Sequence, residues 1–176
     1  MTERGSAITV LIADDHAILR EGLAGLLAEQ DDIRVVGAAV NGADAVAKVR
    51  ELKPNILLLD LIMPEMDGVA ALEALSGEAP DTRTIILTGA EEDELLARSI
   101  QAGAVGYLLK DVASSQLIDA IRTVAAGGCW LPADVTQKLV RAIAGRQNTK
   151  ESDKLPCSRQ ESWRYSDSSV RFRAMC

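Results

Sequence analysis

Several features are scarce or absent in this 176-residue sequence, and each absence excludes a class of protein. No apolar run approaches the roughly 20 residues that a membrane-spanning helix needs. The formal net charge of −7 argues against a protein that coats nucleic acid with basic side chains. The three cysteines lack metal-type spacing, and the start of the chain lacks the basic-then-apolar layout of a secretory signal. We therefore expect a cytoplasmic protein with no membrane partner.

Short aliphatic runs alternate with longer amphipathic segments along most of the chain. Aliphatic runs without polar alternation are typical of strands buried on both faces, and a single apolar stripe is typical of a helix. Five strand–helix units in strict alternation predict an α/β domain: a doubly wound five-stranded parallel sheet with helices on both faces. The predicted strands are residues 9–13, 33–36, 56–59, 84–87 and 106–109.

The chain divides into three predicted parts. Residues 1–128 hold the alternating pattern and form the folded domain. Residues 129–146 are expected to form a linker helix, because Val135, Leu139 and Ile143 belong to a sixth apolar stripe. Residues 147–176 have no periodicity of either kind, and we expect this tail to be disordered.

Polar side chains stand where four of the predicted strands end. Asp14 and Asp15 follow the first strand, and Asp60 follows the third. Thr88 ends the fourth strand and Lys110 the fifth. In an open parallel sheet, ligands bind outside the carboxyl ends of the strands, at the point where the strand order reverses. We therefore expect these five side chains to meet at one edge.

Each of these residues also has an ordinary structural explanation. Asp14 or Asp15 could cap the helix that begins near Ala17, and Asp67 could cap a later helix. Thr88 could simply end a strand and Lys110 could be a solvated loop charge. Their coincidence favours a site, because three neighbouring carboxylates repel one another and need a cation. A small set of hard oxygen ligands favours Mg2+.

Four motifs carry a resemblance to a known family: LIADDHAILREGL, LLLDLIMPEMDG, IILTGAEE and GAVGYLLKD. In this order and spacing they resemble the receiver domain of bacterial two-component response regulators. The DDH…REGL and KD details resemble the NarL/LuxR type. The resemblance covers about residues 8–128. It implies a flavodoxin-like, or CheY-like, fold in which Asp60 accepts a phosphoryl group from a sensor histidine kinase.

The resemblance also implies a metal site for Mg2+. Asp15 and Asp60 would bind the ion directly, and Asp14 would orient a metal-bound water. The main-chain carbonyl of Ile62 would supply a further ligand, and a backbone ligand tolerates any side chain.

The remaining implied roles concern phosphoryl binding and switching. Lys110 would pair with phosphoryl oxygens, and Thr88 would donate its hydroxyl to one of them. Movement of Thr88 would leave space that Tyr107 can fill, which would change the surface of the fourth helix and fifth strand. Tyr107 could instead be an ordinary strand aromatic with its hydroxyl at the surface.

His16, the only histidine, follows the acid pair as in the NarL/LuxR type, so we expect no catalytic or metal role for it. Many receivers have a proline after the lysine, preceded by a cis peptide, whereas this chain has Asp111. A cis bond before a residue other than proline costs about 3 kcal/mol, which leaves the geometry of the Lys110–Asp111 peptide open.

Three functions compete for these residues. A phosphatase of the haloacid-dehalogenase kind would need a second acid two residues after the nucleophile, and position 62 is Ile. That leaves a phosphorylated regulator with DNA output, or a receiver without it that acts as a phosphoryl sink or a dimerising competitor. In either case we expect no enzyme, only Mg2+-dependent self-phosphorylation and autodephosphorylation.

The choice between the two depends on the tail. A NarL/LuxR-type helix-turn-helix domain needs about 60 residues and several apolar stripes. Only 30 residues follow Arg146, and they have no such stripes. The passage KLPCSRQES nevertheless begins where the family usually has a Leu-Thr-Pro-Arg-Glu-Arg-like start. We therefore hypothesise a frameshifted or truncated regulator, for which DNA binding is doubtful.

Overall fold

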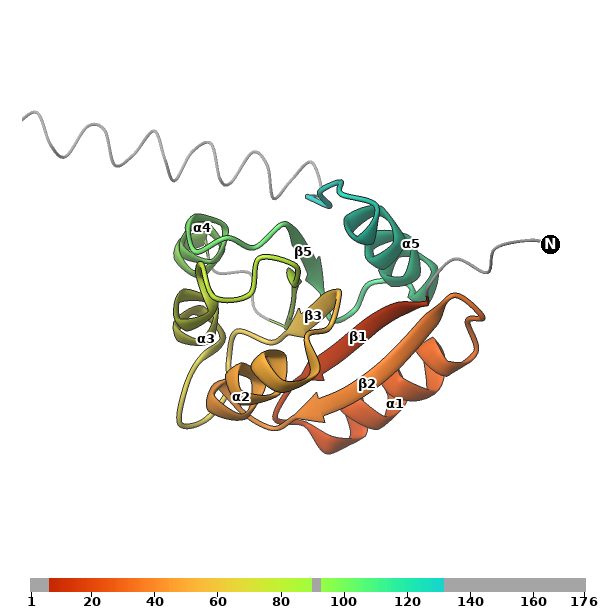
Figure 1. The fold of residues 1–176 in the computed structure, drawn as a ribbon, viewed down its shortest axis with the longest axis horizontal. Coiled ribbons are helices and arrows are strands. Elements are labelled where there is room, and N and C mark those ends of the chain that lie inside the picture. Colours follow the sequence, from red (N-terminus) through yellow and green to blue (C-terminus); the bar gives the residue numbers. More distant parts are fainter. Residues whose placement is uncertain (1–6, 90–92, 132–176) are drawn as a thin grey trace, which may run out of the picture.

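The computed structural model describes residues 7–89 and 93–131, and over this range strands and helices alternate strictly (Figure 1). The predicted alternation is confirmed. The tail, residues 147–176, lies outside the described residues. The elements are β1 (Ile8–Ala13), α1 (Ala17–Ala28), β2 (Ile33–Ala39), α2 (Gly42–Leu52), β3 (Ile56–Leu59), α3 (Gly68–Leu75), β4 (Arg83–Thr88), α4 (Asp93–Gln101), β5 (Gly106–Leu109) and α5 (Ser114–Ala125).

The sheet has the strand order β2-β1-β3-β4-β5, and every neighbouring pair is parallel. Helices α1 and α5 pack on one face of the sheet, and α2, α3 and α4 pack on the other. The chain passes from β1 outward to β2 and then returns to β3 on the other side of β1. The strand order therefore reverses between β1 and β3, which is where a doubly wound sheet forms a crevice for ligands.

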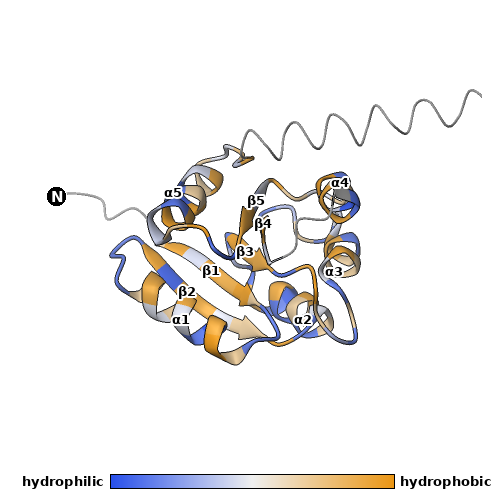
Figure 2. Cartoon of the chain, turned by 180° about the vertical axis from the view of Figure 1, so that it is seen from behind, coloured by the Kyte–Doolittle hydropathy of each residue, from blue (hydrophilic) through white to orange (hydrophobic). Residues whose placement is uncertain are grey.

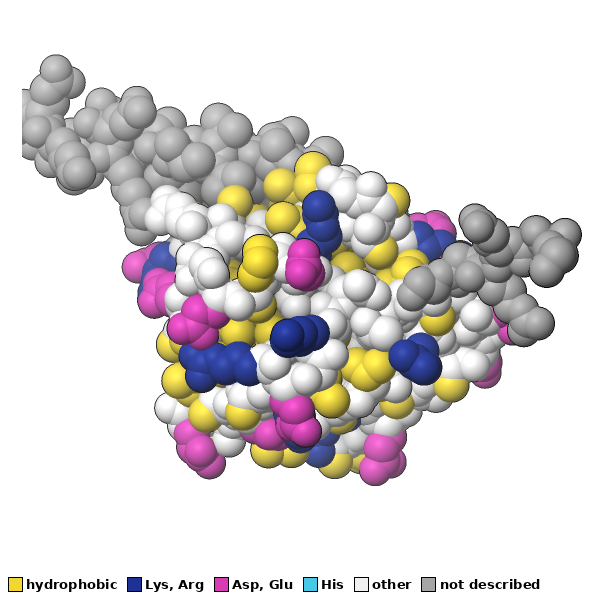
Figure 3. All heavy atoms as spheres, viewed as in Figure 1, with side chains coloured by type: hydrophobic (Ala, Val, Ile, Leu, Met, Phe, Trp, Pro, Cys, Tyr) yellow, Lys and Arg dark blue, Asp and Glu magenta, His cyan; other side chains and the backbone are white. Residues whose placement is uncertain are grey.

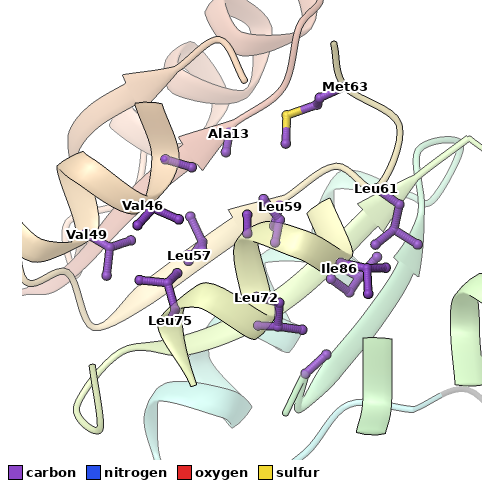
Figure 4. Close-up of a cluster of buried hydrophobic side chains, with 14 of the residues drawn as sticks. Ala13, Val46, Val49, Leu57, Leu59, Leu61, Met63, Leu72, Leu75 and Ile86 are labelled. Atoms are coloured by element: carbon purple, nitrogen blue, oxygen red, sulfur yellow. The ribbon is translucent and has the colours of Figure 1, made fainter. Parts of the chain in front are cut away.

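Strand β3 lies at the centre of the sheet, and its four aliphatic residues are at most 1% exposed. Leu57 and Leu59 point into the core beneath α2 and α3, as Figure 4 shows. Ile56 and Leu58 face the other way and pack with residues of α1 and α5. An uninterrupted apolar run thus serves both faces, because successive side chains in a strand point to opposite sides.

Strand β2 differs from the prediction of burial on both faces. It continues to Ala39, and Arg34, its second residue, is exposed. In Figure 2 a blue, hydrophilic band interrupts the hydrophobic colour of this strand. The reason is topological: β2 is at the edge of the sheet, so fewer neighbours cover it.

The segment after α5 was predicted to begin a linker helix at residue 129, and this start is wrong. Trp130 forms a parallel bridge with Gly106 of β5. The amide of Trp130 donates to the carbonyl of Val105 at 3.0 Å, and the amide of Tyr107 donates to the carbonyl of Trp130 at 2.9 Å. These bonds satisfy backbone groups on the outer edge of β5 that a helix at this point would leave unpaired. Residues 132–146 of the predicted helix lie outside the described residues.

No helix among residues 7–89 and 93–131 combines the length and the apolar character needed to cross a bilayer.

Core packing around β3 leads to a stability prediction. Leu58 is 1% exposed, so Leu58→Ala should lower the free energy of unfolding by about 2–5 kcal/mol through lost burial and a residual cavity. Urea unfolding of the two proteins measures this difference. The control is Ile18→Ala on α1, where the side chain is 87% exposed and the change should stay within about 0.5 kcal/mol. Equal losses in both variants would contradict the central position of β3.

Candidate functional site

Asp60 follows β3 directly and is held in place by the ends of two strands. Its amide donates to the carbonyl of Ala13 at the end of β1, at 2.9 Å. Its side chain is only 3% exposed, and both carboxylate oxygens accept hydrogen bonds. Oδ1 accepts from the amide of Ile62 at 3.3 Å, and Oδ2 accepts from Lys110 Nζ at 2.6 Å. The carboxylate is therefore buried and fixed in orientation.

Lys110 joins two buried carboxylates. Its Nζ lies 2.6 Å from Asp60 Oδ2 and 2.7 Å from Asp14 Oδ2, and the Asp14 side chain is also only 3% exposed. The backbone of Lys110 is set by a hydrogen bond from its amide to the carbonyl of Thr88, at 2.9 Å. One ammonium thus separates two carboxylates that come from different strands.

Burial and the ion pairs act on the pKa values in opposite directions. Burial raises the pKa of Asp60 above its usual value, and the hydrogen bond from Lys110 offsets only part of that rise. Burial lowers the pKa of Lys110, but its hydrogen bonds to Asp14 and Asp60 outweigh this, so the pKa lies above its usual value. The lysine therefore remains a cation in this site.

Asp15 and His16 complete the cluster from its exposed side. His16 Nδ1 lies 2.8 Å from Asp15 Oδ1 and 3.1 Å from Asp14 Oδ1. One ligand atom from each of Asp14, Asp15, His16 and Asp60 lies within 4.8 Å of all the others. Three carboxylates and an imidazole at this spacing could bind a metal, and the donor set fits a divalent cation. No catalytic or metal role was predicted for His16, although it directly follows the acid pair in the sequence.

The capping explanation is wrong for Asp14 and Asp15. The residue before α1 is His16, and no side chain caps that helix. Asp14 Oδ1 instead accepts from the amide of His16 at 2.8 Å, which fixes the turn between β1 and α1. For Asp67 the capping explanation is right, because its Oδ1 accepts from the amide of Ala70 at 2.7 Å.

Thr88 and Tyr107 lie near the same edge. Thr88 ends β4 and is fully buried, and its main chain is paired with the residue before Lys110 in the sheet register. Tyr107 on β5 is 3% exposed, so the expectation of a hydroxyl at the surface is wrong for this conformation. Their roles in phosphoryl binding and switching stay predictions. No peptide bond in the described residues is cis, so the Lys110–Asp111 peptide is trans.

Gly68 explains how the loop after Asp60 packs so closely against it. The amide of Gly68 donates to the carbonyl of Leu61 at 3.0 Å. A Cβ at this position would overlap the main-chain carbonyl oxygen of Asp60 and crowd the Cα of Leu61. The start of α3 can therefore approach the backbone of Asp60 only with glycine at this position.

Residues 10–122 match the family model of the response regulator receiver domain. The fold, the acidic cluster and this match agree, and the chain belongs to the response regulator receiver family.

Curated relatives include regulators of several bacteria. The chain is 40% identical over 133 residues to the response regulator GacA of Pseudomonas protegens, a match that covers 76% of this chain and 62% of that protein. It is 37% identical over 133 residues to the transcriptional regulatory protein LnrK of Bacillus subtilis, covering 76% of this chain and 60% of that protein. The chain thus spans about three fifths of the length of these relatives.

Solved structures give the same assignment. The signal receiver domain of the response regulator NarL from Mycobacterium tuberculosis aligns with a TM-score of 0.67 and 32% identity, over 69% of this chain and 98% of that one. A LuxR-family response regulator from Aurantimonas aligns with a TM-score of 0.72 and 27% identity, over 79% of this chain and 99% of that one. The predicted CheY-like fold and the NarL/LuxR resemblance are confirmed.

The close approach at Gly68 can be tested with a second glycine as the control. Gly68→Ala should lower the free energy of unfolding by about 1–3 kcal/mol, because the backbone of Asp60 or α3 must move. Gly25→Ala, in the middle of α1 with nothing within 4 Å of the new Cβ, should raise it by about 0.5–1 kcal/mol. Urea unfolding measures both, and a stabilising Gly68→Ala would contradict the described packing.

The raised pKa of Asp60 predicts how stability depends on pH without metal. The native state keeps a proton on Asp60 at a higher pH than the unfolded chain does. Its contribution to stability is therefore lost as pH rises from the ordinary carboxyl range through the raised pKa. In EDTA near neutral pH, Asp60→Asn should unfold at a higher urea concentration than the parent protein.

This gain should shrink as the pH falls towards about 4, where the unfolded carboxyl also takes up a proton. Asp81→Asn, in an exposed turn, is the control and should follow the parent at every pH. A constant difference between Asp60→Asn and the parent across this range would show that titration of Asp60 is not its source.

Proposed function

We propose that Asp60 accepts a phosphoryl group from a sensor histidine kinase in a Mg2+-dependent reaction, and that this modification switches the domain. The observation that carries the proposal is the placement of Asp60. It is a buried carboxylate at the crevice of the sheet, fixed by Lys110 and the amide of Ile62, and its ligand atom lies within 4.8 Å of those of Asp14 and Asp15. Membership of the receiver family supports the same reaction.

The transfer is a displacement at phosphorus. A carboxylate oxygen of Asp60 attacks the phosphorus of the kinase phosphohistidine, and the P–N bond breaks with its electron pair moving to the imidazole. The product is an acyl phosphate on Asp60 and a free histidine that takes up a proton. Such a transfer depends mainly on positioning and on neutralising charge, both of which this site offers.

Asp14, Asp15, Asp60 and the carbonyl of Ile62 would hold the Mg2+ ion. When bound, the ion supplies positive charge that offsets the charge of the carboxylates and of the phosphoryl oxygens. The geometry at Asp60 supports this assignment, because its Oδ1 already accepts from the amide of Ile62 and the turn is therefore close to the site.

Lys110 and Thr88 act on the phosphoryl group itself. Lys110 exchanges its bond to Asp60 for one to a phosphoryl oxygen while it keeps Asp14, and its hydrogen bonds with the two acids keep it charged for this step. Thr88 donates its hydroxyl to another phosphoryl oxygen. The switch involves Thr88 and Tyr107. Because the amide of Tyr107 bonds to Trp130, a shift of β5 also moves the segment that leaves the domain.

The wider role follows from the relatives. LnrK is named a transcriptional regulatory protein. A solved structure of RcsB from Salmonella typhimurium concerns the conformational dynamism of that regulator for DNA interaction. By this analogy the chain is a cytoplasmic phosphorelay regulator of transcription that can form a homodimer. It is not an enzyme beyond its own phosphorylation and autodephosphorylation.

A receiver that acts without DNA output remains the second candidate. All elements in residues 7–89 and 93–131 belong to the receiver fold. On the face drawn in Figure 3, the Lys and Arg side chains lie in separate places among acidic and uncharged ones, so this face offers no basic patch for DNA. Such a chain would serve as a phosphoryl sink or as a dimerising competitor.

Phosphorylation by a small acyl phosphate tests the central proposal. Incubation with Mg2+ and acetyl phosphate should add one phosphoryl group, detected by intact mass, and EDTA should prevent it. Asp60→Asn should abolish the adduct. The matched control is Asp67→Asn in the same loop, which keeps a helix cap and should be phosphorylated like the parent. An undiminished adduct in Asp60→Asn would refute the assignment of the acceptor.

A further inference from the structure

Arg20 reaches from α1 back to the acidic cluster but plays no part in the reaction described above. Its Nη1 donates to the main-chain carbonyl of Asp14 at 2.6 Å, and the side chain is half-buried. Its own amide donates to the carbonyl of His16 at 3.1 Å, so Arg20 lies one helical turn after the residue that precedes α1. The guanidinium therefore spans the turn that carries the acid pair.

Asp14 is the first residue after the paired part of β1. The ladder between β1 and its neighbours ends at Ala13, and the amide of Asp14 makes one further bond to Ala39, at 3.2 Å. On the other side of the residue, the carbonyl accepts the hydrogen bond from Arg20. Loss of this bond would leave the main chain of Asp14 with one hydrogen bond, from its amide to Ala39, and so freer to rotate.

Rotation there would move a side chain that the site needs. The Asp14 carboxylate accepts from Lys110 at 2.7 Å through Oδ2 and from the amide of His16 at 2.8 Å through Oδ1. These bonds hold the carboxylate in one orientation. A change in the Asp14 backbone would shift both oxygens relative to Asp60. Preorganised ligands bind a metal more tightly than ligands that must first be ordered.

The positive charge of Arg20 could by itself weaken cation binding, but it has an acidic neighbour outside the cluster. The hydrogen bond from Lys48 is the main reason that the pKa of Asp44 is lowered, and the charge of Arg20 adds to the effect. Asp44 belongs to the first turn of α2. Arg20 therefore also interacts electrostatically with an anion outside the cluster, and we expect the geometric contribution to dominate.

We propose that Arg20 is a positioning residue that holds the Asp14 peptide so that the Asp14 carboxylate is oriented for a divalent cation. The proposal rests on the proposed Mg2+-dependent function of the same cluster. It assigns to the arginine of the REGL segment a role in metal affinity, distinct from the chemistry at Asp60.

The test is a Mg2+ titration of the melting temperature, with no phosphoryl donor present. Binding to the native state raises the melting temperature in proportion to ln(1 + [Mg2+]/Kd), so a fit of the rise gives the Mg2+ concentration of half-saturation, called the Mg2+ midpoint below. Arg20→Gln should have a Mg2+ midpoint about tenfold higher than the parent, the lower end of what loss of an outer-shell partner costs. Arg20→Lys keeps the charge and a donor and should recover part of the affinity. Arg34→Gln removes one positive charge from exposed β2 and should match the parent.

Phosphorylation by acetyl phosphate gives a second measurement. Arg20→Gln should reach the parent rate at saturating Mg2+ and fall below it at low Mg2+, since Asp60 is intact. If Arg20→Gln melts lower than the parent but keeps its Mg2+ midpoint, Arg20 has only a structural role and the inference is wrong. A midpoint below that of the parent would show that charge repulsion dominates, which also overturns it.

Two further outcomes separate this inference from the proposed function. If the parent protein shows neither a Mg2+-dependent rise nor phosphorylation, the proposed function fails and the role of Arg20 falls with it. If the parent responds to Mg2+ and the Arg20 variants have the same Mg2+ midpoint as the parent, the inference fails while the proposed function stands. Should Arg20→Gln not fold, Arg20→Lys decides the question, and an unchanged midpoint in that variant would overturn the inference.

Discussion

Electrostatic repulsion between buried carboxylates is the constraint on which the site depends. Asp14 and Asp60 are both 3% exposed, and Lys110 lies within 2.7 Å of each. Without this ammonium, two anions would share a poorly solvated crevice, where charges repel by several kcal/mol at intermediate dielectric. Burial raises the pKa of Asp60 more than the hydrogen bond from Lys110 lowers it, so Lys110 alone does not offset the cost of burying this charge. A site left short of positive charge is well suited to accept a cation, and the fold keeps it in that state.

The topology of the fold brings these two carboxylates close together. The strand order reverses between β1 and β3, so the acids that follow these strands meet at one edge although they are far apart in the sequence. The apolar residues of β3 anchor Asp60 from both faces, and Gly68 lets α3 approach its backbone. Rigid burial of the strand therefore gives Asp60, the first residue after it, a defined position.

Much of this arrangement follows from the sequence, because it depends on patterns that are local. Apolar runs predicted every strand, and their ends predicted that Asp60, Asp14 and Lys110 converge. Features that depend on the third dimension were missed. The exposure of Arg34 follows from the place of β2 at the sheet edge, which periodicity does not encode. Likewise, the bond from Arg20 to Asp14 joins a side chain to a backbone carbonyl, and no residue pattern marks such a contact.

The bridge between Trp130 and β5 has a consequence for how copies of this domain can meet. An open sheet can grow by adding a strand from another molecule to either exposed edge. Alongside β5 the chain itself occupies part of that place, because Val105 and Tyr107 already bond to Trp130. At the opposite edge, β2 presents the charged Arg34. Within the described residues, strand addition is thus disfavoured on both sides, so a copy that docked on the outward surfaces of the helices would leave the sheet undisturbed.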